Sequence, residues 1–349
     1  MKPLVVRVGA LGDLVMCTPA LRYLSRRFGA PVDVLARDPA PALFAQLPFV
    51  GSVYSLRSKR TPFWLDWSQW GAVRFVGAEG PRPLFVFEDN RKIDWLIERG
   101  RAGGPLISFR DHRRLGNEHQ IEQQLRLCAM LIDGAPPPLA EEQREPWTEV
   151  RVDEMEIQRC RRFLSNALGA GDAPILVVHP GNSRTQRGRG KAWDPKFWPL
   201  SHWKVALAEI LRADADVRIL ISGVAAESRI AEELVRAIPG NARARSIAGE
   251  LDVRGLAAVL CVATGCISID TGPAHLAAAV GCPLVVLFGG TDPRVNRPVA
   301  RRSPVQVVTD VHGGGPEDSE RSWAATHDIT RIEPGQVVAA WEAIAAARR

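Results

Sequence analysis

The sequence lacks the cysteine spacing of a metal site. Its six cysteines are scattered along 349 residues, and none forms a C-x-x-C pair or a zinc-binding pattern. Most of them lie in apolar runs, which is typical of buried, reduced thiols. The one Asp-x-Asp motif, at 214–216, lies between an expected helix and an expected strand, so it indicates a solvated turn. We therefore predict no metal site.

Long apolar runs are also missing. The most apolar stretch, 256–269, contains Gly265 and is shorter than the roughly 20 residues that span a bilayer. The run at 4–8 is too short for the apolar core of a secretory signal peptide. Neither a solenoid repeat nor a P-loop is present. We therefore expect a soluble, cytoplasmic protein.

The two signs of charge are not balanced. Lys and Arg outnumber Asp and Glu, and the formal net charge is +6. Such an excess suits an anionic partner, such as a phosphate-rich small molecule, an anionic membrane face or nucleic acid. Arginine-rich solvated faces explain the same excess, so the charge alone does not choose among these. Because no nucleic-acid recognition motif is present, we expect no nucleic-acid partner.

Apolar runs and helix-like stripes alternate in both halves of the chain. In the first half, the run at 4–8 precedes a glycine-containing turn, a helix-like stripe over 14–28 and a second run at 32–36. In the second half we expect strands at 175–179, 217–222, 266–269 and 284–288, and helices at 200–212, 227–238, 253–262 and 273–280. This alternation predicts α/β structure with doubly wound parallel sheets.

A proline-rich and acidic stretch interrupts the pattern near the middle of the chain. Three prolines at 136–138 and an acidic run at 141–145 indicate a surface connection. We therefore place an N-terminal domain at 1–150 and a C-terminal domain at 151–349. The segment 333–349 predicts a terminal helix, and packing of that helix on the N-terminal domain is left open.

The first candidate segment is the Gly-Ala-Leu-Gly-Asp turn at 9–13, which joins an expected strand to an expected helix. In open α/β sheets this edge is where ligands bind. Glycines let the backbone approach a ligand closely, and a helix N-terminus favours an anion. Asp13 also has a structural role available, as a helix cap or first-turn carboxylate, and the residues alone leave both roles open.

The second segment, 270–275, joins an apolar strand to an apolar helix. Pro273 suits the first helical turn, and Asp270 or Thr271 can cap it. The backbone N–H groups that follow Thr271 favour a diphosphate, and His275 could add a donor. A well-capped core helix with a packed histidine is the structural alternative.

Two further features precede it in the second half. A loop after His179 contains the cations Arg184, Arg187, Arg189, Lys191 and Lys196. It predicts either a phosphate clamp or a solvated loop. Beyond the next expected strand, Gly223 is followed by Glu227, whose carboxylate could bind a ribose or simply occupy the first turn of a helix.

In their order along one chain, these segments resemble glycosyltransferase family 9, which contains the ADP-heptose:lipopolysaccharide heptosyltransferases. The shared motifs are a G-x-x-G-D turn, His-Pro-Gly with a basic loop and Lys-x-Trp-Pro, Gly-x-x-x-Glu, and Asp-Thr-Gly-Pro-x-His-x-Ala-Ala-Ala-x-Gly. The resemblance spans most of the chain and is strongest over 4–28 and 175–289. The segment 270–281 is its most specific element.

The resemblance implies a GT-B fold, in which two doubly wound Rossmann-like domains face a central cleft. It implies an inverting, metal-independent glycosyltransferase that moves a heptose or related sugar from an ADP-sugar to a hydroxyl of a lipopolysaccharide core or a similar anionic glycan. ADP-heptose is then a substrate, and no cofactor is expected. A glycolipid acceptor would also bring the protein to the cytoplasmic face of the inner membrane.

The same resemblance implies roles for individual residues. Asp13 matches the proposed catalytic base. The residues that match donor-binding positions are Lys196, Lys191, Glu227, Asp270, Thr271, Gly272 and His275. Lys196 matches the phosphate-binding lysine by its spacing to the following Trp-Pro, and Lys191 is a second candidate because this loop is longer and richer in arginine than the family pattern. The residues in the region that serves an anionic acceptor are Arg57, Lys59 and Arg60.

Three alternative functions stay open. They are a nucleotide-sugar epimerase of the same fold, a family 9 transferase that acts on a protein or small-molecule acceptor, and a non-catalytic nucleotide-binding module. An epimerase needs further cleft carboxylates, which the sequence does not supply, and a non-catalytic module does not need Asp13. Beside the basic cluster, Trp64, Trp67 and Trp70 either pack in the core or form a rim that touches lipid headgroups or a large acceptor.

Overall fold

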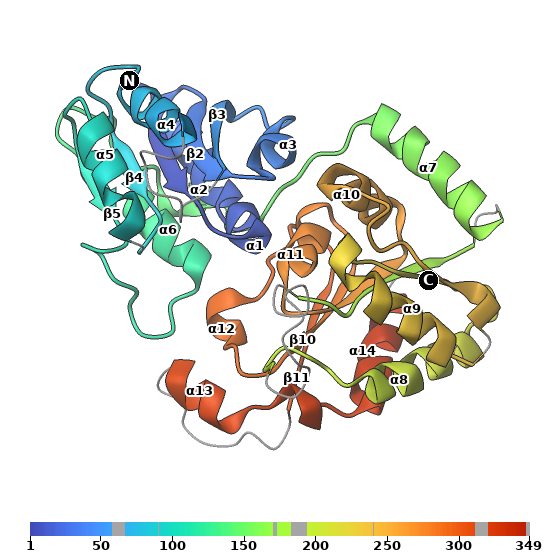
Figure 1. Ribbon diagram of the computed structural model, residues 1–349. Coiled ribbons are helices and arrows are strands. Elements are labelled where there is room, and N and C mark those ends of the chain that lie inside the picture. Colours follow the sequence, from blue (N-terminus) through green and yellow to red (C-terminus); the bar gives the residue numbers. More distant parts are fainter. Residues whose placement is uncertain are drawn as a thin grey trace. The chain divides into compact units, whose positions relative to one another are not determined.

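The computed structural model describes residues 1–57, 67–89, 91–169, 173–182, 194–239, 241–310 and 320–346. These residues form two compact units, Met1–Arg151 and Val152–Arg349 (Figure 1). The boundary expected from the sequence falls one residue earlier. Each unit holds one parallel sheet with helices packed against it, so the expected doubly wound α/β architecture is confirmed in both. In the described part of the chain, no helix combines the length and apolar character needed to cross a membrane.

The first unit contains a five-stranded parallel sheet in the order β3-β2-β1-β4-β5. Its strands are β1 (Leu4–Arg7), β2 (Val32–Arg37), β3 (Val50–Leu56), β4 (Leu84–Val86) and β5 (Leu106–Ser108). The chain adds β2 and β3 on one side of β1 and then returns to the other side with β4 and β5. Because ligands of open α/β sheets bind beyond the strand ends where the order reverses, the residues that follow β1 and β4 lie at the expected ligand edge.

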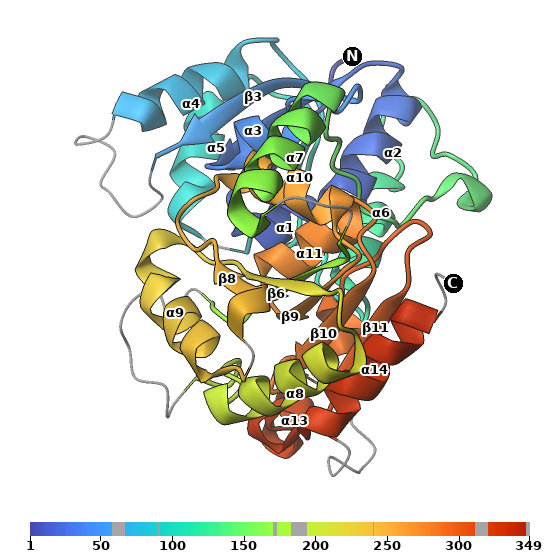
Figure 2. The ribbon, with the colours of Figure 1, turned by 90° about the vertical axis from the view of Figure 1, so that its right-hand side faces the viewer.

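Two helical layers cover this sheet. The helices are α1 (Leu11–Val15), α2 (Thr18–Phe28), α3 (Ala40–Phe44), α4 (Trp67–Gly77), α5 (Asp94–Gly100) and α6 (Gln120–Cys128). α4 packs on α5, and α2 packs on α6 (Figure 2). Leu4, Val6 and Val8 join the apolar core under α4 and α5. Because side chains alternate along a strand, Arg7 points to the opposite face, toward α6.

The single helix expected over 14–28 is wrong, because the segment forms two helices, α1 and α2. Pro19 explains the break. It has no N–H to donate, and its ring would clash with the carbonyl of Val15 if the helix were continuous. At the junction, the Thr18 hydroxyl donates instead to the Val15 carbonyl at 2.8 Å. The break leaves α1 as a short separate helix that contains Asp13.

The second unit contains a six-stranded parallel sheet in the order β11-β10-β9-β6-β7-β8. Its strands are β6 (Ile175–His179), β7 (Arg218–Ile221), β8 (Ala244–Ser246), β9 (Gly265–Ile269), β10 (Leu284–Phe288) and β11 (Val305–Thr309). Here the chain adds β7 and β8 on one side of β6 and returns with β9 on the other. The strand order therefore reverses between β6 and β9, and the residues that follow these two strands share one edge.

The helices of the second unit follow the expected pattern closely. They are α7 (Glu154–Leu168), α8 (Leu200–Ala213), α9 (Ser228–Ala237), α10 (Val253–Val262), α11 (Gly272–Ala279), α12 (Pro293–Asn296), α13 (Glu320–Thr326) and α14 (Pro334–Ala346). The expected bounds of α8 to α11 are within one residue of these. The terminal helix α14 packs on α8, β9, β10 and β11, all elements of its own unit.

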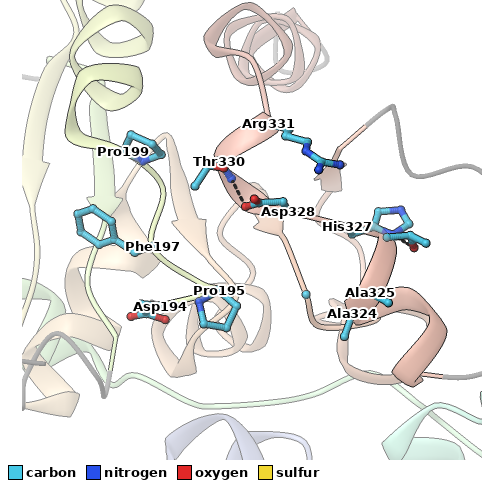
Figure 3. Close-up of a pocket in the computed structure, with 12 residues that line it drawn as sticks. Asp194, Pro195, Phe197, Pro199, Ala324, Ala325, His327, Asp328, Thr330 and Arg331 are labelled. Carbon is cyan, nitrogen blue, oxygen red and sulfur yellow. Dashed lines mark hydrogen bonds between the residues drawn. The ribbon is translucent and has the colours of Figure 1, made fainter. Parts of the chain in front are cut away.

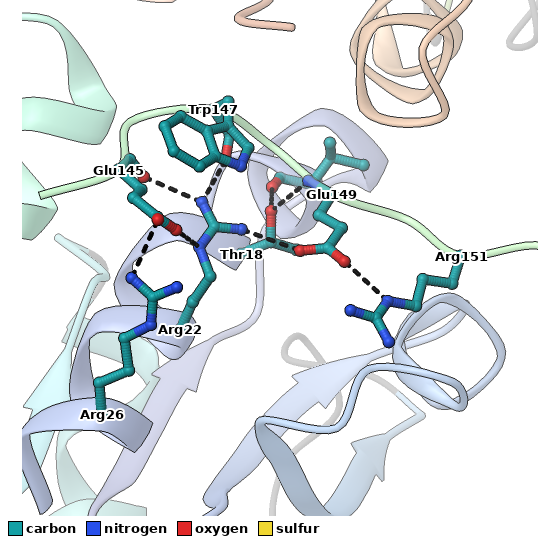
Figure 4. Close-up of polar contacts among 8 residues, drawn as sticks. Thr18, Arg22, Arg26, Glu145, Trp147, Glu149 and Arg151 are labelled. Atoms are coloured by element: carbon teal, nitrogen blue, oxygen red, sulfur yellow. Dashed lines mark hydrogen bonds and ion pairs between the residues drawn. The ribbon is translucent and has the colours of Figure 1, made fainter. Parts of the chain in front are cut away.

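An arginine on α2 anchors the segment that leads out of the first unit (Figure 4). The Arg22 guanidinium donates to the backbone carbonyls of Glu145 and Trp147 at 3.0 and 2.7 Å, and it pairs with the carboxylates of Glu145 and Glu149. Its carbon lies 5.0 Å from the centre of the Trp147 ring. The Thr18 hydroxyl accepts the Glu149 N–H at 3.0 Å. The segment 145–149 is thereby fixed to α2.

We predict that Arg22→Met lowers the free energy of unfolding by about 3 to 5 kcal/mol, because removing the cation leaves partly buried carboxylates and carbonyls without their donor. Arg26→Met is the matched control. Arg26 pairs with the same Glu145 carboxylate at 3.1 Å, but its side chain is 48% exposed. We expect that control to lose less than about 1 kcal/mol. Urea unfolding measures both, and equal losses would show that Arg22 is not an anchor.

Candidate active site

In the second unit, the segment predicted to bind a diphosphate lies at the reversal point of the sheet. Asp270 follows β9 directly and is buried. Thr271 has extended backbone and is the N-cap of α11, and its hydroxyl donates to the Ile269 carbonyl at 3.2 Å. Gly272 begins the helix, and His275 lies buried in its first turn. The N-terminal end of α11, with its partial positive charge, therefore lies at the carboxyl edge of β9.

Lys196 lies at the same place. Its Nζ is 2.5 Å from Oδ2 of Asp270 and 3.2 Å from the Asp270 carbonyl oxygen. The lysine side chain is 36% exposed, whereas that of Asp270 is 6% exposed. The buried carboxylate of Asp270 therefore holds the cation of a side chain that is partly exposed to solvent. Lys191, the other lysine proposed from the sequence, lies outside the described residues.

Two polar residues that sequence reasoning missed hold the backbone of Lys196 in place. Asp194 accepts the Lys196 N–H through Oδ1 at 3.1 Å, and it accepts the Asn182 side-chain amide through Oδ2 at 2.7 Å. Asn182 and Asp194 are both buried. Between them lies the segment 183–193 with most of the basic residues, outside the described residues. The pair joins the two ends of that segment.

Glu227 lies near the ends of the neighbouring strands β6 and β7. It closes the short 3-10 helix Ala225–Glu227 and accepts the Val224 N–H through Oε2 at 2.9 Å, so the structural role of a first-turn glutamate is present. Its side chain is buried. A Cβ atom built on Gly181, beyond β6, would lie only 2.3 Å from Oε1. The carboxylate therefore fills the space that a glycine after β6 leaves open.

His179 ends β6 and is fully enclosed. Its Nδ1 lies 3.0 Å from the Ser222 hydroxyl, which follows β7. Burial lowers the pKa of His179 from 6.5 to about 4. The ring is therefore neutral at physiological pH, and it links the ends of two adjacent strands without adding charge.

In the first unit, Asp13 lies in α1 at the other reversal point. Its Oδ2 accepts the Ala10 N–H at 2.8 Å, and its Oδ1 lies 2.6 Å from Nη2 of Arg7. The side chain is 30% exposed. A Cβ atom on Gly9 would lie 2.4 Å from Oδ2, so only glycine fits beside this carboxylate. The capping role that the sequence left open is thus present, together with an ion pair.

The partners of Asp13 were not apparent from the sequence. Arg7 ends β1, and its side chain is 7% exposed. Its guanidinium also donates to the Phe87 carbonyl and to Oε1 of Gln120, which begins α6. Glu88 follows β4, accepts the Val8 N–H at 2.8 Å and lies 3.7 Å from Nη1 of Arg7. The nearby Asp13 and two segments that are distant in sequence, at 87–88 and at the start of α6, therefore meet around one buried guanidinium.

The proposed acceptor residues are described only in part. Arg57 follows β3 and is exposed, whereas Lys59 and Arg60 lie outside the described residues, as does Trp64. On α4, Trp67 is 87% exposed, so packing in the core is wrong for this residue. Trp70 is 39% exposed and contacts the Trp95 ring edge to face at 6.4 Å.

A separate pocket of about 730 Å³ lies in the second unit (Figure 3). One wall contains Asp194, Pro195 and Phe197, and the opposite wall contains His327 and Arg331 from the end of α13 and the turn after it. Asp270 and His275 do not line it. The described residues also include no cluster of three or more His, Cys, Asp or Glu side chains that could hold a metal ion.

Comparisons with known proteins show the family and the fold. The model of glycosyltransferase family 9 (heptosyltransferase) matches residues 90–314. Lipopolysaccharide heptosyltransferase 1 of Pseudomonas aeruginosa is 28% identical over 314 residues, which cover 84% of this chain and 80% of that protein. The structure of ADP-heptose lipopolysaccharide heptosyltransferase II of Escherichia coli has a TM-score of 0.75 at 20% identity and covers 100% of this chain and 99% of its own. The E. coli heptosyltransferase WaaC with ADP has a TM-score of 0.70 at 20% identity, with coverages of 98% and 99%.

We predict that His179 makes stability depend on pH. Between pH 6.5 and about 4 the unfolded chain binds a proton at this ring and the folded chain does not, so stability falls as the pH decreases through this window. Between pH 7 and pH 4.5 the native protein should lose about 2 kcal/mol more than His179→Asn, which cannot titrate there. Urea unfolding of both chains at pH 7 and pH 4.5 measures the difference. The same pH dependence in the two chains would contradict this assignment.

Proposed function

The chain belongs to glycosyltransferase family 9, and we propose that it transfers a heptose or a related sugar from an ADP-sugar to a hydroxyl of a lipopolysaccharide core or a similar anionic glycan. The observation that carries the proposal is the contact of Lys196 with Asp270 at the N-terminus of α11. A lysine and a helix N-terminus at one strand edge provide two sources of positive charge for a diphosphate. The proposed reaction inverts the anomeric carbon and needs no metal.

The donor is proposed to bind along the edge formed by β9, β6 and β7. Its diphosphate would accept hydrogen bonds from Lys196 and from the backbone at Thr271 and Gly272, with His275 in the same helical turn. Glu227, at the ends of β6 and β7, has a carboxylate that suits ribose hydroxyls. ADP in a structural relative supports an adenine nucleotide, and the curated relatives named as heptosyltransferases support a heptose.

Asp13 is proposed as the general base. It takes the proton of the acceptor hydroxyl while that oxygen forms a bond to the anomeric carbon of the donor. The bond from the same carbon to the diphosphate oxygen breaks, and ADP leaves with the electron pair. Lys196 and the N-terminus of α11 stabilise the negative charge that develops on the leaving group. The exposed fraction of Asp13 gives a hydroxyl access to the carboxylate.

The acceptor is proposed to be anionic. Arg57 is exposed beyond β3, and Lys59 and Arg60 follow it in the sequence. Trp67 and Trp70 lie exposed on α4 in the same unit, and Arg99 lies 5.8 Å from the Trp70 ring. Indole rings with nearby cations suit the boundary between lipid headgroups and apolar chains. We therefore propose a glycolipid acceptor and peripheral contact with the cytoplasmic face of the membrane.

We predict that Asp13→Asn lowers kcat by about two to four orders of magnitude, the usual contribution of a general base. Donor affinity should stay near its native value, because the donor is proposed to bind in the other unit. The melting temperature should fall, because asparagine has one acceptor oxygen, whereas the carboxylate accepts from both Arg7 and the Ala10 N–H. Asp153→Asn is the control, since Asp153 caps α7 in the other unit. The measurement is heptose transfer from ADP-heptose to a lipopolysaccharide core acceptor. A near-native kcat for Asp13→Asn would remove Asp13 from the mechanism.

We also predict that ADP raises the melting temperature without added metal, by binding the folded state alone. Lys196→Ala should weaken ADP binding about 10- to 100-fold, the value of one to two hydrogen bonds to a charged group. Lys191→Ala serves as the comparison and should weaken binding less. Calorimetric titration in the presence of a chelator measures all three proteins. Equal ADP affinity in the native chain and Lys196→Ala would show that Lys196 is not the phosphate-binding lysine.

A further inference from the structure

We infer that Arg7 is a positioning residue, which fixes the Asp13 carboxylate in the orientation needed to accept a proton; this inference rests on the proposed function. The two side chains meet at the ends of β1 and α1, where Nη2 of Arg7 lies 2.6 Å from Oδ1 of Asp13. A base must approach the proton that it removes within hydrogen-bond distance and in one direction. A carboxylate on a short helix reaches that precision only if its rotation is restricted.

The guanidinium is itself held from several sides. Phe87 accepts a hydrogen bond from Nη1 through its carbonyl, and Gln120 accepts one from Nη2 at 3.2 Å. The Phe109 ring, beyond β5, lies 5.8 Å from the guanidinium carbon. The first residues beyond β4 and β5 and the first residue of α6 each supply one of these contacts. Arg7 therefore links Asp13, in a helix of five residues, to the end of the sheet.

The carboxylate of Asp13 is held at both oxygens. Arg7 binds Oδ1, and the Ala10 N–H binds Oδ2 at 2.8 Å. Gly9 leaves space beside it that any Cβ atom would occupy. An ionised carboxylate has about four lone-pair sites, so two bonds still leave sites for a substrate hydroxyl. The side chain is therefore fixed in rotation and still accessible at 30% exposure.

The ion pair of Arg7 also differs in exposure from a purely structural ion pair of the same unit. In the same sheet, at the opposite strand ends, Arg82 pairs with Asp33 at 2.8 Å, and both side chains are less than 5% exposed. Arg7 is equally enclosed, but the carboxylate that it binds reaches solvent. Glu88, 7% exposed and 3.7 Å from Arg7, supplies the second negative charge that keeps the buried cation paired. Arg7 thus orients an accessible carboxylate, whereas Arg82 binds a buried one.

A double-mutant cycle tests this role. Replacing Arg7 alone would remove the cation that lies 3.7 Å from the buried Glu88 carboxylate, so the main variant combines Arg7→Met with Glu88→Gln. We expect its kcat to fall about 10- to 100-fold, the usual effect of displacing a catalytic group by about 1 Å, while the donor KM stays unchanged. In the Asp13→Asn background the same pair of changes should cause no further loss, because the residue on which Arg7 acts is no longer a base.

Arg7→Lys and Arg82→Lys complete the experiment. Arg7→Lys keeps the charge and one contact, so it should recover part of the lost kcat. Arg82→Lys should lower the melting temperature and leave kcat unchanged. An equal loss of kcat in both Asp13 backgrounds, or no loss in the native background, would overturn the positioning role and leave Asp13 as the proposed base. An Asp13→Asn chain with native kcat would overturn both proposals.

Discussion

Reversal of strand order is the constraint on which the other features depend. Each unit begins with a strand that becomes central, because later strands are added first on one side of it and then on the other. Where the order reverses, the connections that follow two adjacent strands run to opposite sides. The carboxyl ends of these two strands therefore stay open to a ligand. Asp13 follows β1, and Asp270 follows β9, at these two places. The candidate residues are therefore grouped by topology, although they are widely separated in sequence.

Pairing of buried charge is the second common feature. At one reversal point a buried carboxylate, Asp270, holds a partly exposed lysine, and at the other a buried guanidinium, Arg7, holds a partly exposed carboxylate. In both cases the buried partner restricts the rotation of the charged side chain that it binds, and that second side chain is partly exposed to solvent. The buried member of each pair, Asp270 or Arg7, needs an opposite charge beside it, because an unpaired buried ion is costly. The two pairs therefore have the same arrangement, but the accessible charge is positive at Lys196 and negative at Asp13.

Much of this structure follows from local sequence patterns. Strands β6 and β10 and helix α10 have the predicted bounds, because each is a mostly apolar segment between clear turn signals. Strands β4 and β5 could not be predicted in this way, since each has only three residues and gives no measurable periodicity. The break between α1 and α2 could have been read from Pro19.

The candidate site was predictable to the extent that its residues stand in motifs. The order of the motifs along the chain predicted Asp13, Lys196 and Asp270, and the structure shows the last two in contact. Gln120 and Glu88 stand in no motif, and only the folded sheet brings them to Arg7. Residues that support others through space have no fixed spacing, so a single sequence does not reveal them.

The bond between Asn182 and Asp194 has a consequence for how this chain can vary. Because the two side chains join the residues on either side of the segment 183–193, the position of Lys196 is set by that contact and not by the length of the segment. Lengthening a loop whose ends are already fixed costs little, about 0.6 kcal/mol for each doubling. A change in the length of this segment is therefore expected to leave the position of Lys196 unchanged.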